Sequence, residues 1–173
     1  MPRPLLLQAP EWTLDARAAS RQTFAMPYSL QIVIDSTNPH ALAEWWAETL
    51  GWVVEPSDPA FIRSMIDQGF AAETDAITHN GALVWKIGSA ITAVPDTAEP
   101  GQPRMLFQLA AEGEPAKTAK NRVHWDVRLG GEDKTDTRAR LEARGATFLW
   151  EASQGPFSWI TLADPEGNEF CIG

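Results

Sequence analysis

The order strand, helix, strands occurs twice along this chain, and this repeat constrains its fold more than any other feature. The first copy begins with the alternating residues 30–35 (LQIVID), followed by a helix that opens at Asn38 and stops at Gly51. The second begins with residues 122–129 (RVHWDVRL) and continues into a charged helix over residues 133–144. A repeat of this length is typical of two similar modules within one domain, because solenoid repeats are shorter.

Further elements follow from alternation and from turn residues. We expect a short helix over residues 60–69 and strands over 82–87, 105–110, 146–151, 157–163 and 169–172. The sequence Asp-Pro-Glu-Gly-Asn at residues 164–168 is a turn, because proline presets φ and glycine supplies a positive φ. Residues 95–103 and 112–120 are expected to be loops.

Length and composition predict one globular domain. A chain of 173 residues, 44% of them hydrophobic, can bury roughly 70% of the surface that it exposes when unfolded. We place this domain at residues 27–173, with module one at about 28–112 and module two at about 120–173. Residues 1–26 show no sustained period and form an extension, for which both an ordered arm and a flexible tail are open.

The charge and the cysteine count restrict partners and compartment. A net charge of −9 repels the phosphates of nucleic acids and of anionic lipids, so neither is an expected partner. No stretch approaches the ~20 apolar residues of a membrane helix. A single cysteine, Cys171, allows no internal disulfide. We therefore expect a cytoplasmic protein.

Three motifs resemble one known family. They are residues 30–35 with the following AEWW and LGW, residues 120–127 (KNRVHWDV), and residues 163–171 (ADPEGNEFC). In this order they resemble glyoxalase-like proteins of the vicinal oxygen chelate superfamily, which also contains bleomycin-resistance proteins and dioxygenases. The resemblance covers about residues 28–173. It implies an α+β fold in which two βαβββ modules form a curled mixed sheet around a small-molecule cup, and it implies a homodimer that protects open strand edges.

The resemblance also implies a metal site. Members of the family hold a divalent metal with one side chain from the first and the last strand of each module. The matching positions here are Gln31 and Gln108 in the first module and His124 and Cys171 in the second. The family usually has a glutamate where this chain has Cys171, although Glu169 points to the same face of that strand. Zn²⁺, Ni²⁺, Fe²⁺ or Mn²⁺ are the candidate ions.

Three functions remain open for these residues when the resemblance is taken into account. The first is a metal enzyme of the lyase, isomerase or dioxygenase class, although two neutral amides make a weak ligand set. The second is a metal-free enzyme in which His124 and Glu169 form an acid–base pair and the two glutamines orient a carbonyl. The third is an antibiotic-type binding or resistance protein, in which tryptophans stack on a flat ligand. The candidate ligand-binding residues are Gln31, Gln108, Trp46, Trp85 and Trp159.

Each candidate also has a purely structural interpretation. His124 can be a hydrogen-bonded sheet residue, and Cys171 can be a small buried hydrophobe. The amides of Gln31 and Gln108 can satisfy one another. No role is assigned to His40 or His79. The basic residues between 117 and 122 form either a solvated loop or a clamp for an anionic substrate.

Overall fold

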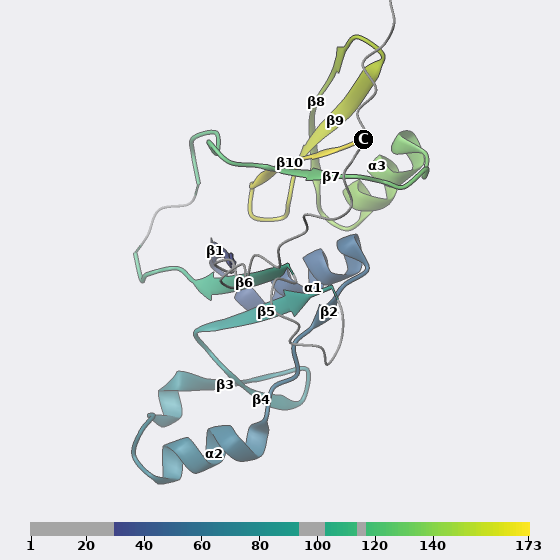
Figure 1. The fold of residues 1–173 in the computed structure, drawn as a ribbon. Helices are drawn as coiled ribbons and strands as arrows, with labels where there is room; N and C mark the ends of the chain where they lie inside the picture. The colour runs from purple at the N-terminus through teal and green to yellow at the C-terminus, as the bar shows by residue number, and fades with distance from the viewer. Residues whose placement is uncertain (1–29, 94–102, 114–116) are drawn as a thin grey trace, which may run out of the picture.

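The computed structural model describes residues 30–93, 103–113 and 117–173. The predicted N-terminal extension and most of the predicted loop over 95–103 lie outside these residues. The fold is a mixed α+β arrangement of two four-stranded sheets and a separate two-stranded hairpin (Figure 1).

The first sheet contains β1 (Ile32–Ser36), β2 (Val53–Val54), β5 (Gly88–Thr92) and β6 (Arg104–Leu109) in the order β1-β6-β5-β2. Strand β1 runs parallel to β6, whereas the other neighbours are antiparallel. Helix α1 (Pro39–Leu50) connects β1 to β2. Its predicted ends are confirmed: the Asn38 side chain accepts the amide of Ala41, and Gly51 has a left-handed φ of 65°.

The second sheet repeats this plan. It contains β7 (Trp125–Val127), β8 (Thr147–Gln154), β9 (Phe157–Ala163) and β10 (Glu169–Ile172) in the order β7-β10-β9-β8. Helix α3 (Lys134–Ala143) connects β7 to β8 and begins after Asp133, which caps two backbone amides. The first, fourth, third and second strands of each module thus lie in the same order, which confirms two βαβββ modules.

Strand β7 is shorter than the predicted strand over 122–129. Only three residue pairs connect it to β10, from Trp125–Phe170 to Val127–Ile172. Upstream, the amide of Asn121 donates to the side chain of Glu169 at 2.9 Å. A side-chain acceptor therefore takes the place of a strand partner at this end.

An insertion makes the two modules differ in detail. In the second module, β8 and β9 form one long hairpin. In the first module, the two strands of the corresponding hairpin, β2 and β5, pair with each other but are separated in sequence by an insertion. The insertion consists of α2 (Pro59–Asp67), a short 3₁₀ turn (Glu73–Asp75) and the paired strands β3 and β4. The hairpin of β3 (Ala76–His79) and β4 (Ala82–Trp85) extends from the first sheet on the side away from the second (Figure 1).

Helix α1 provides the core that both sheets share. The ring of Trp46 lies 5.0 Å from that of Phe170 on β10, and the ring of Trp45 lies 5.8 Å from it. Trp46 is fully buried and its Nε1 donates to Asp164 Oδ2 at 3.0 Å. The prediction that Trp46 contacts a ligand is therefore wrong, because the indole has neither an exposed face nor a free donor.

The turn between β9 and β10 joins the modules a second time. Glu166 in this turn accepts the Ser36 hydroxyl at 2.8 Å and the amides of Thr37 and Asn38 at 3.0 Å each. These donors lie at the end of β1 and in the link from β1 to α1. One carboxylate of the second module thus satisfies the polar groups at the start of the first module's helix.

Candidate functional site

One face of the second sheet packs into the shared core. Alternation directs Trp125, Phe170 and Leu162 into that core. Asp126, Cys171 and Thr161 then point to the opposite face, where Cys171 is the register partner of both Asp126 on β7 and Thr161 on β9. His124 precedes Trp125, the first residue of β7, and its side chain joins them.

Three potential metal ligands converge on this opposite face. The ligand atoms of His124, Asp126 and Cys171 all lie within 4.8 Å of one another. His124 Nε2 stands 3.6 Å from Asp126 Oδ1. The thiol of Cys171 is buried, whereas the other two side chains are exposed. The structure thus brings together two of the predicted ligands and adds Asp126, which lies two residues after His124 and so shares its face.

The protonation of Cys171 follows from its surroundings. Burial raises the pKa of this thiol, and the nearby carboxylate of Asp126 raises it further. The Thr161 hydroxyl, 3.4 Å from Sγ, acts in the opposite direction without cancelling the increase. Cys171 is therefore a neutral thiol at pH 7, and it must release a proton to coordinate a metal.

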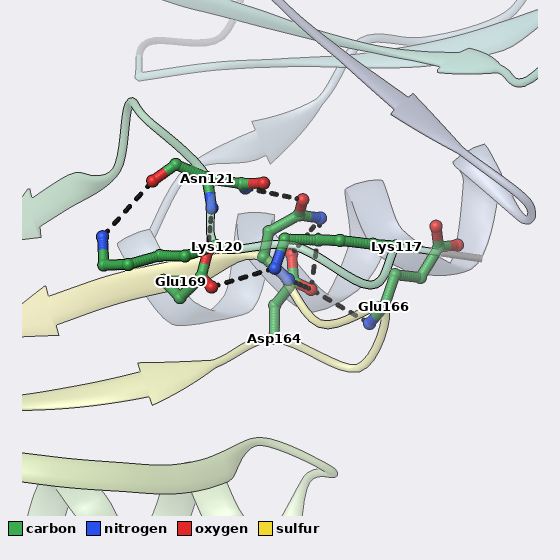
Figure 2. A network of polar contacts seen from close by, with 7 residues as sticks. Lys117, Lys120, Asn121, Asp164, Glu166 and Glu169 are labelled. Carbon is green, nitrogen blue, oxygen red and sulfur yellow. Dashed lines mark hydrogen bonds and ion pairs between the residues drawn. The ribbon is translucent and has the colours of Figure 1, made fainter. Parts of the chain in front are cut away.

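Glu169, the predicted acid–base partner of His124, is held by other groups. Its Oε1 accepts the ammonium of Lys117 at 2.9 Å and its Oε2 accepts the amide of Asn121 at 2.9 Å (Figure 2). Burial alone would raise its pKa, but these two hydrogen bonds outweigh burial and lower it. Glu169 is thus a stable carboxylate, and a proton-transfer role would require Lys117 to move away.

The predicted glutamine ligands lie on the other sheet. Gln31 precedes β1, and its amide oxygen accepts Arg104 Nη1. Arg104 also donates two bonds of 2.7 Å to Glu55, which raises the pKa of the guanidinium. Gln108 is exposed on β6. Gln31 therefore bonds to Arg104 rather than to Gln108, and no hydrogen bond among the described residues links either glutamine to His124 or Cys171.

A cavity of about 520 Å³ opens on the first module. It lies between α1, the β3–β4 hairpin and strands β5 and β6, and we call it the first cavity. Trp85 and Gln108, two predicted ligand-binding residues, line it. Trp159 lies on the same face of β9 as Thr161 and lines neither this cavity nor the next.

A second hollow of about 1160 Å³ lies between β1 and the second module. Val33, Val123 and Trp125 give it an apolar lining, and Lys117 and Arg122 add positive charge at its edge. Lys117 is already paired with Glu169, so Arg122 is the basic residue of this loop that stands free among the described side chains. The anion clamp therefore remains a prediction without further support.

Gly88, at the edge of the first cavity, shows how tightly the first sheet is built there. A Cβ on this residue would stand 2.5 Å from the carbonyl oxygen of Phe107. Glycine is thus required where β5 meets β6.

In the described part of the chain, no helix has the length and apolar character of a membrane span.

Comparison with known proteins gives three findings. The family model of the glyoxalase-like domain matches residues 31–173. Among solved structures, protein ATC0852 from Agrobacterium tumefaciens is 15% identical, with a TM-score of 0.50 and coverage of 85% of this chain and 96% of that one. The fosfomycin resistance protein FosX from Mesorhizobium loti is 7% identical, with a TM-score of 0.50 and coverage of 86% and 91%. No curated protein matches the sequence. At these identities the two structures show a common fold.

Proposed function

The chain belongs to the glyoxalase-like domain family, and from this membership we propose that it is a small-molecule enzyme of the lyase, isomerase or dioxygenase class with a divalent metal at His124, Asp126 and Cys171. One observation carries the proposal, namely the convergence of imidazole, carboxylate and thiol on one sheet face. Fold alone would not select a reaction, so the proposal rests on these three side chains.

The chemistry of the three donors fits a first-row metal. Imidazole and thiolate suit Zn²⁺, Ni²⁺ and Fe²⁺, and a carboxylate adds charge that the predicted glutamines lack. In a tetrahedral zinc site, ligand atoms stand about 3.5 Å apart, as bond lengths near 2.1 Å require. The observed limit of 4.8 Å is longer, but His124 and Asp126 are exposed and can rotate inward. Three protein ligands also leave a coordination position for a substrate or water.

The protein's own groups would prepare this site. Thr161 stands beside the sulfur and can donate a hydrogen bond to the thiolate of Cys171 after its proton has left. Asp126 Oδ1 stands 3.6 Å from His124 Nε2, so the two side chains could reach one ion from the same face. A bound divalent ion would supply polarisation of adjacent substrate oxygens. Without a metal, His124 would act with Glu169 as the acid–base pair, once Lys117 has moved.

Elemental analysis tests the metal site directly. Untagged protein purified without added metal should contain near one equivalent of a first-row metal. His124→Ala and Asp126→Asn should each lose it, whereas Asp136→Asn, an exposed aspartate on α3, should retain it. Absence of metal after incubation with Ni²⁺, Zn²⁺, Mn²⁺ and Fe²⁺ would contradict the metalloenzyme proposal.

A second candidate function is a non-catalytic binding or resistance protein. The first cavity favours it, since Trp85, Ile87 and Leu106 line a space within the ordinary size range of ligand pockets. The fold shared with FosX is consistent with such a role. A thermal-shift screen with flat cationic drugs should then show stabilisation without turnover. Trp85→Ala should abolish the shift, whereas Trp159→Ala should preserve it.

We also propose that the protein is a cytoplasmic homodimer. In the described residues, β1 and β7 each end a sheet and pair on one side only. Open edges of this kind are commonly covered by a second copy. Light scattering during gel filtration should give twice the chain mass of 19.0 kDa, and the mass of one chain would contradict the dimer.

A further inference from the structure

Two histidines without an assigned role meet at the first cavity. His40 lies in the first turn of α1, and His79 ends β3. Their rings stack with centroids 4.9 Å apart and an interplanar angle of 30°. Both line the first cavity, which lies on a different sheet from the group around Cys171.

Glu44 orients the imidazole of His79. Its Oε1 accepts a hydrogen bond from His79 Nε2 at 2.7 Å and another from the side-chain amide of Asn80, Nδ2, at 2.7 Å. A carboxylate can only accept, so the proton of neutral His79 resides on Nε2 and the lone pair on Nδ1. No hydrogen bond among the described residues engages Nδ1. A carboxylate that fixes the tautomer of an imidazole is the arrangement of an oriented general base.

The hairpin turn fixes the position of His79. His79 pairs with Ala82, so Asn80 and Gly81 form a two-residue loop. Both have positive φ, 48° and 80°, as a tight type I′ turn requires. His79 is thus held by a short, stiff connection rather than by a long loop.

His40 restricts the same ring from the other side. Its Nε2 lies 2.9 Å from the carbonyl oxygen of Trp85, which can only accept, so Nε2 donates. His40 is itself buried, at 7% exposure. The stacked His40 ring therefore limits rotation of the His79 imidazole.

The rest of the cavity limits what can enter. Trp85, Ile87 and Leu106 provide apolar and aromatic surface, and Gln108 provides an amide. The charge of Arg104 is neutralised by Glu55, and Glu44 adds a second carboxylate to the cavity lining. An anionic ligand would meet carboxylates in a chain of net charge −9. The cavity suits flat molecules that are neutral or cationic.

We propose that His79, positioned by Glu44, is a proton-transferring catalytic residue of the first cavity for flat, uncharged or cationic molecules. Nδ1 takes a proton from a C–H or O–H group of the ligand, and the electron pair of that bond remains on the ligand. The carboxylate of Glu44 stabilises the resulting imidazolium through Nε2. This assignment does not depend on a metal at Cys171.

A flat neutral probe, 5-nitrobenzisoxazole, tests the assignment without knowledge of the natural substrate. A base removes its C3 proton, the released electron pair forms the nitrile, and the N–O bond breaks to give a coloured cyanonitrophenolate. With a chelator present throughout, the protein should exceed an equal concentration of free imidazole by at least about tenfold. His79→Ala and the bulkier His79→Gln should both fall to the background rate, with circular dichroism confirming that they fold.

Glu44→Gln tests the positioning role. Its kcat should fall while the KM for the probe stays near the wild-type value, because the imidazole loses the acceptor that orients it. Glu48→Gln, one turn further along α1, exposed and paired with Arg144, should leave both kcat and KM unchanged. A wild-type rate equal to free imidazole, or full activity in the His79 variants, would overturn the proposal. Metal content is measured separately, so either outcome leaves the metal site to its own test.

Discussion

Cys171 and Asp126 are direct partners across the parallel strands β10 and β7, and this pairing places a carboxylate beside a buried thiol. Asp126 adds to the increase in pKa that burial imposes on the thiol. A neighbour of this kind disfavours a free thiolate but becomes favourable once a cation lies between the two groups. We therefore expect a bound cation to favour the thiolate of Cys171, and metal binding can test this.

Cobalt is the probe for this relationship. Co²⁺ added to the protein should give thiolate-to-metal charge-transfer absorption in the near ultraviolet. Cys171→Ser should remove that band and weaken binding by more than roughly 100-fold, beyond the loss expected for an outer-shell contact. Wild-type protein without the band, or a variant that keeps it, would show that the sulfur is not a ligand.

Lys117 should stabilise the fold in a pH-dependent manner. Lys117→Met should cost ~1–3 kcal/mol in the free energy of unfolding at pH 7, because buried Glu169 loses its charged donor. The pKa of Glu169 is lowered in the folded state, so its contribution is full above the unfolded value of about 4.3 and is lost as the pH falls further. The difference between wild type and variant should therefore narrow below about pH 4.

Urea denaturation between pH 3 and pH 8 measures this difference. Lys120→Met is the matched control, since among the described residues the one hydrogen bond that Lys120 donates goes to the carbonyl of Asn121 at 3.3 Å. A variant difference that stays constant with pH would mean that Lys117 acts through packing rather than through Glu169.

Glu166 should contribute to the attachment of one module to the other. Glu166→Ala removes the acceptor of the Ser36 hydroxyl and of two backbone amides. We expect a loss of ~2 kcal/mol and a fall in Tm of roughly 4–8 °C, since several charge-assisted bonds are broken, of which the one to Ser36 is partly buried. Glu142→Gln, which breaks a surface pair with Arg138, should cost under about 0.5 kcal/mol. Equal effects of the two variants in a calorimetric scan would count against this role.

Much of the fold could be predicted because local residues mark where its helices and strands begin and end. Asn38 and Gly51 define α1, and the turn at residues 164–168 separates β9 from β10 as expected. Strand β4 lies within the predicted strand over residues 82–87, but β3 and the hairpin were missed although Asn80-Gly81 is a strong turn signal, because both strands are short and their faces are largely exposed. Strand β2 has only two residues, too few to show alternation.

The positions of His124 and Cys171 followed from the family resemblance. Alternation along residues 122–129 could have added Asp126, which shares a face with His124. The contact of His79 with Glu44 spans 35 residues and depends on where the inserted hairpin lies, so no local pattern reports it. Trp46 was misassigned because a helix stripe does not distinguish a core indole from one that lines a pocket.

Trp46 and Trp85 should therefore separate stability from binding. Trp46→Phe loses the bond to Asp164 and part of the contact with Phe170, so it should cost ~2–4 kcal/mol in unfolding free energy. Its Co²⁺ affinity and its rate with 5-nitrobenzisoxazole should match wild type below the unfolding transition. Trp85→Phe, on the half-buried wall of the first cavity, should change the probe's KM with a smaller loss of stability. If Trp46→Phe instead altered probe binding in a fully folded protein, the indole would have to reach the cavity, against its complete burial in the shared core.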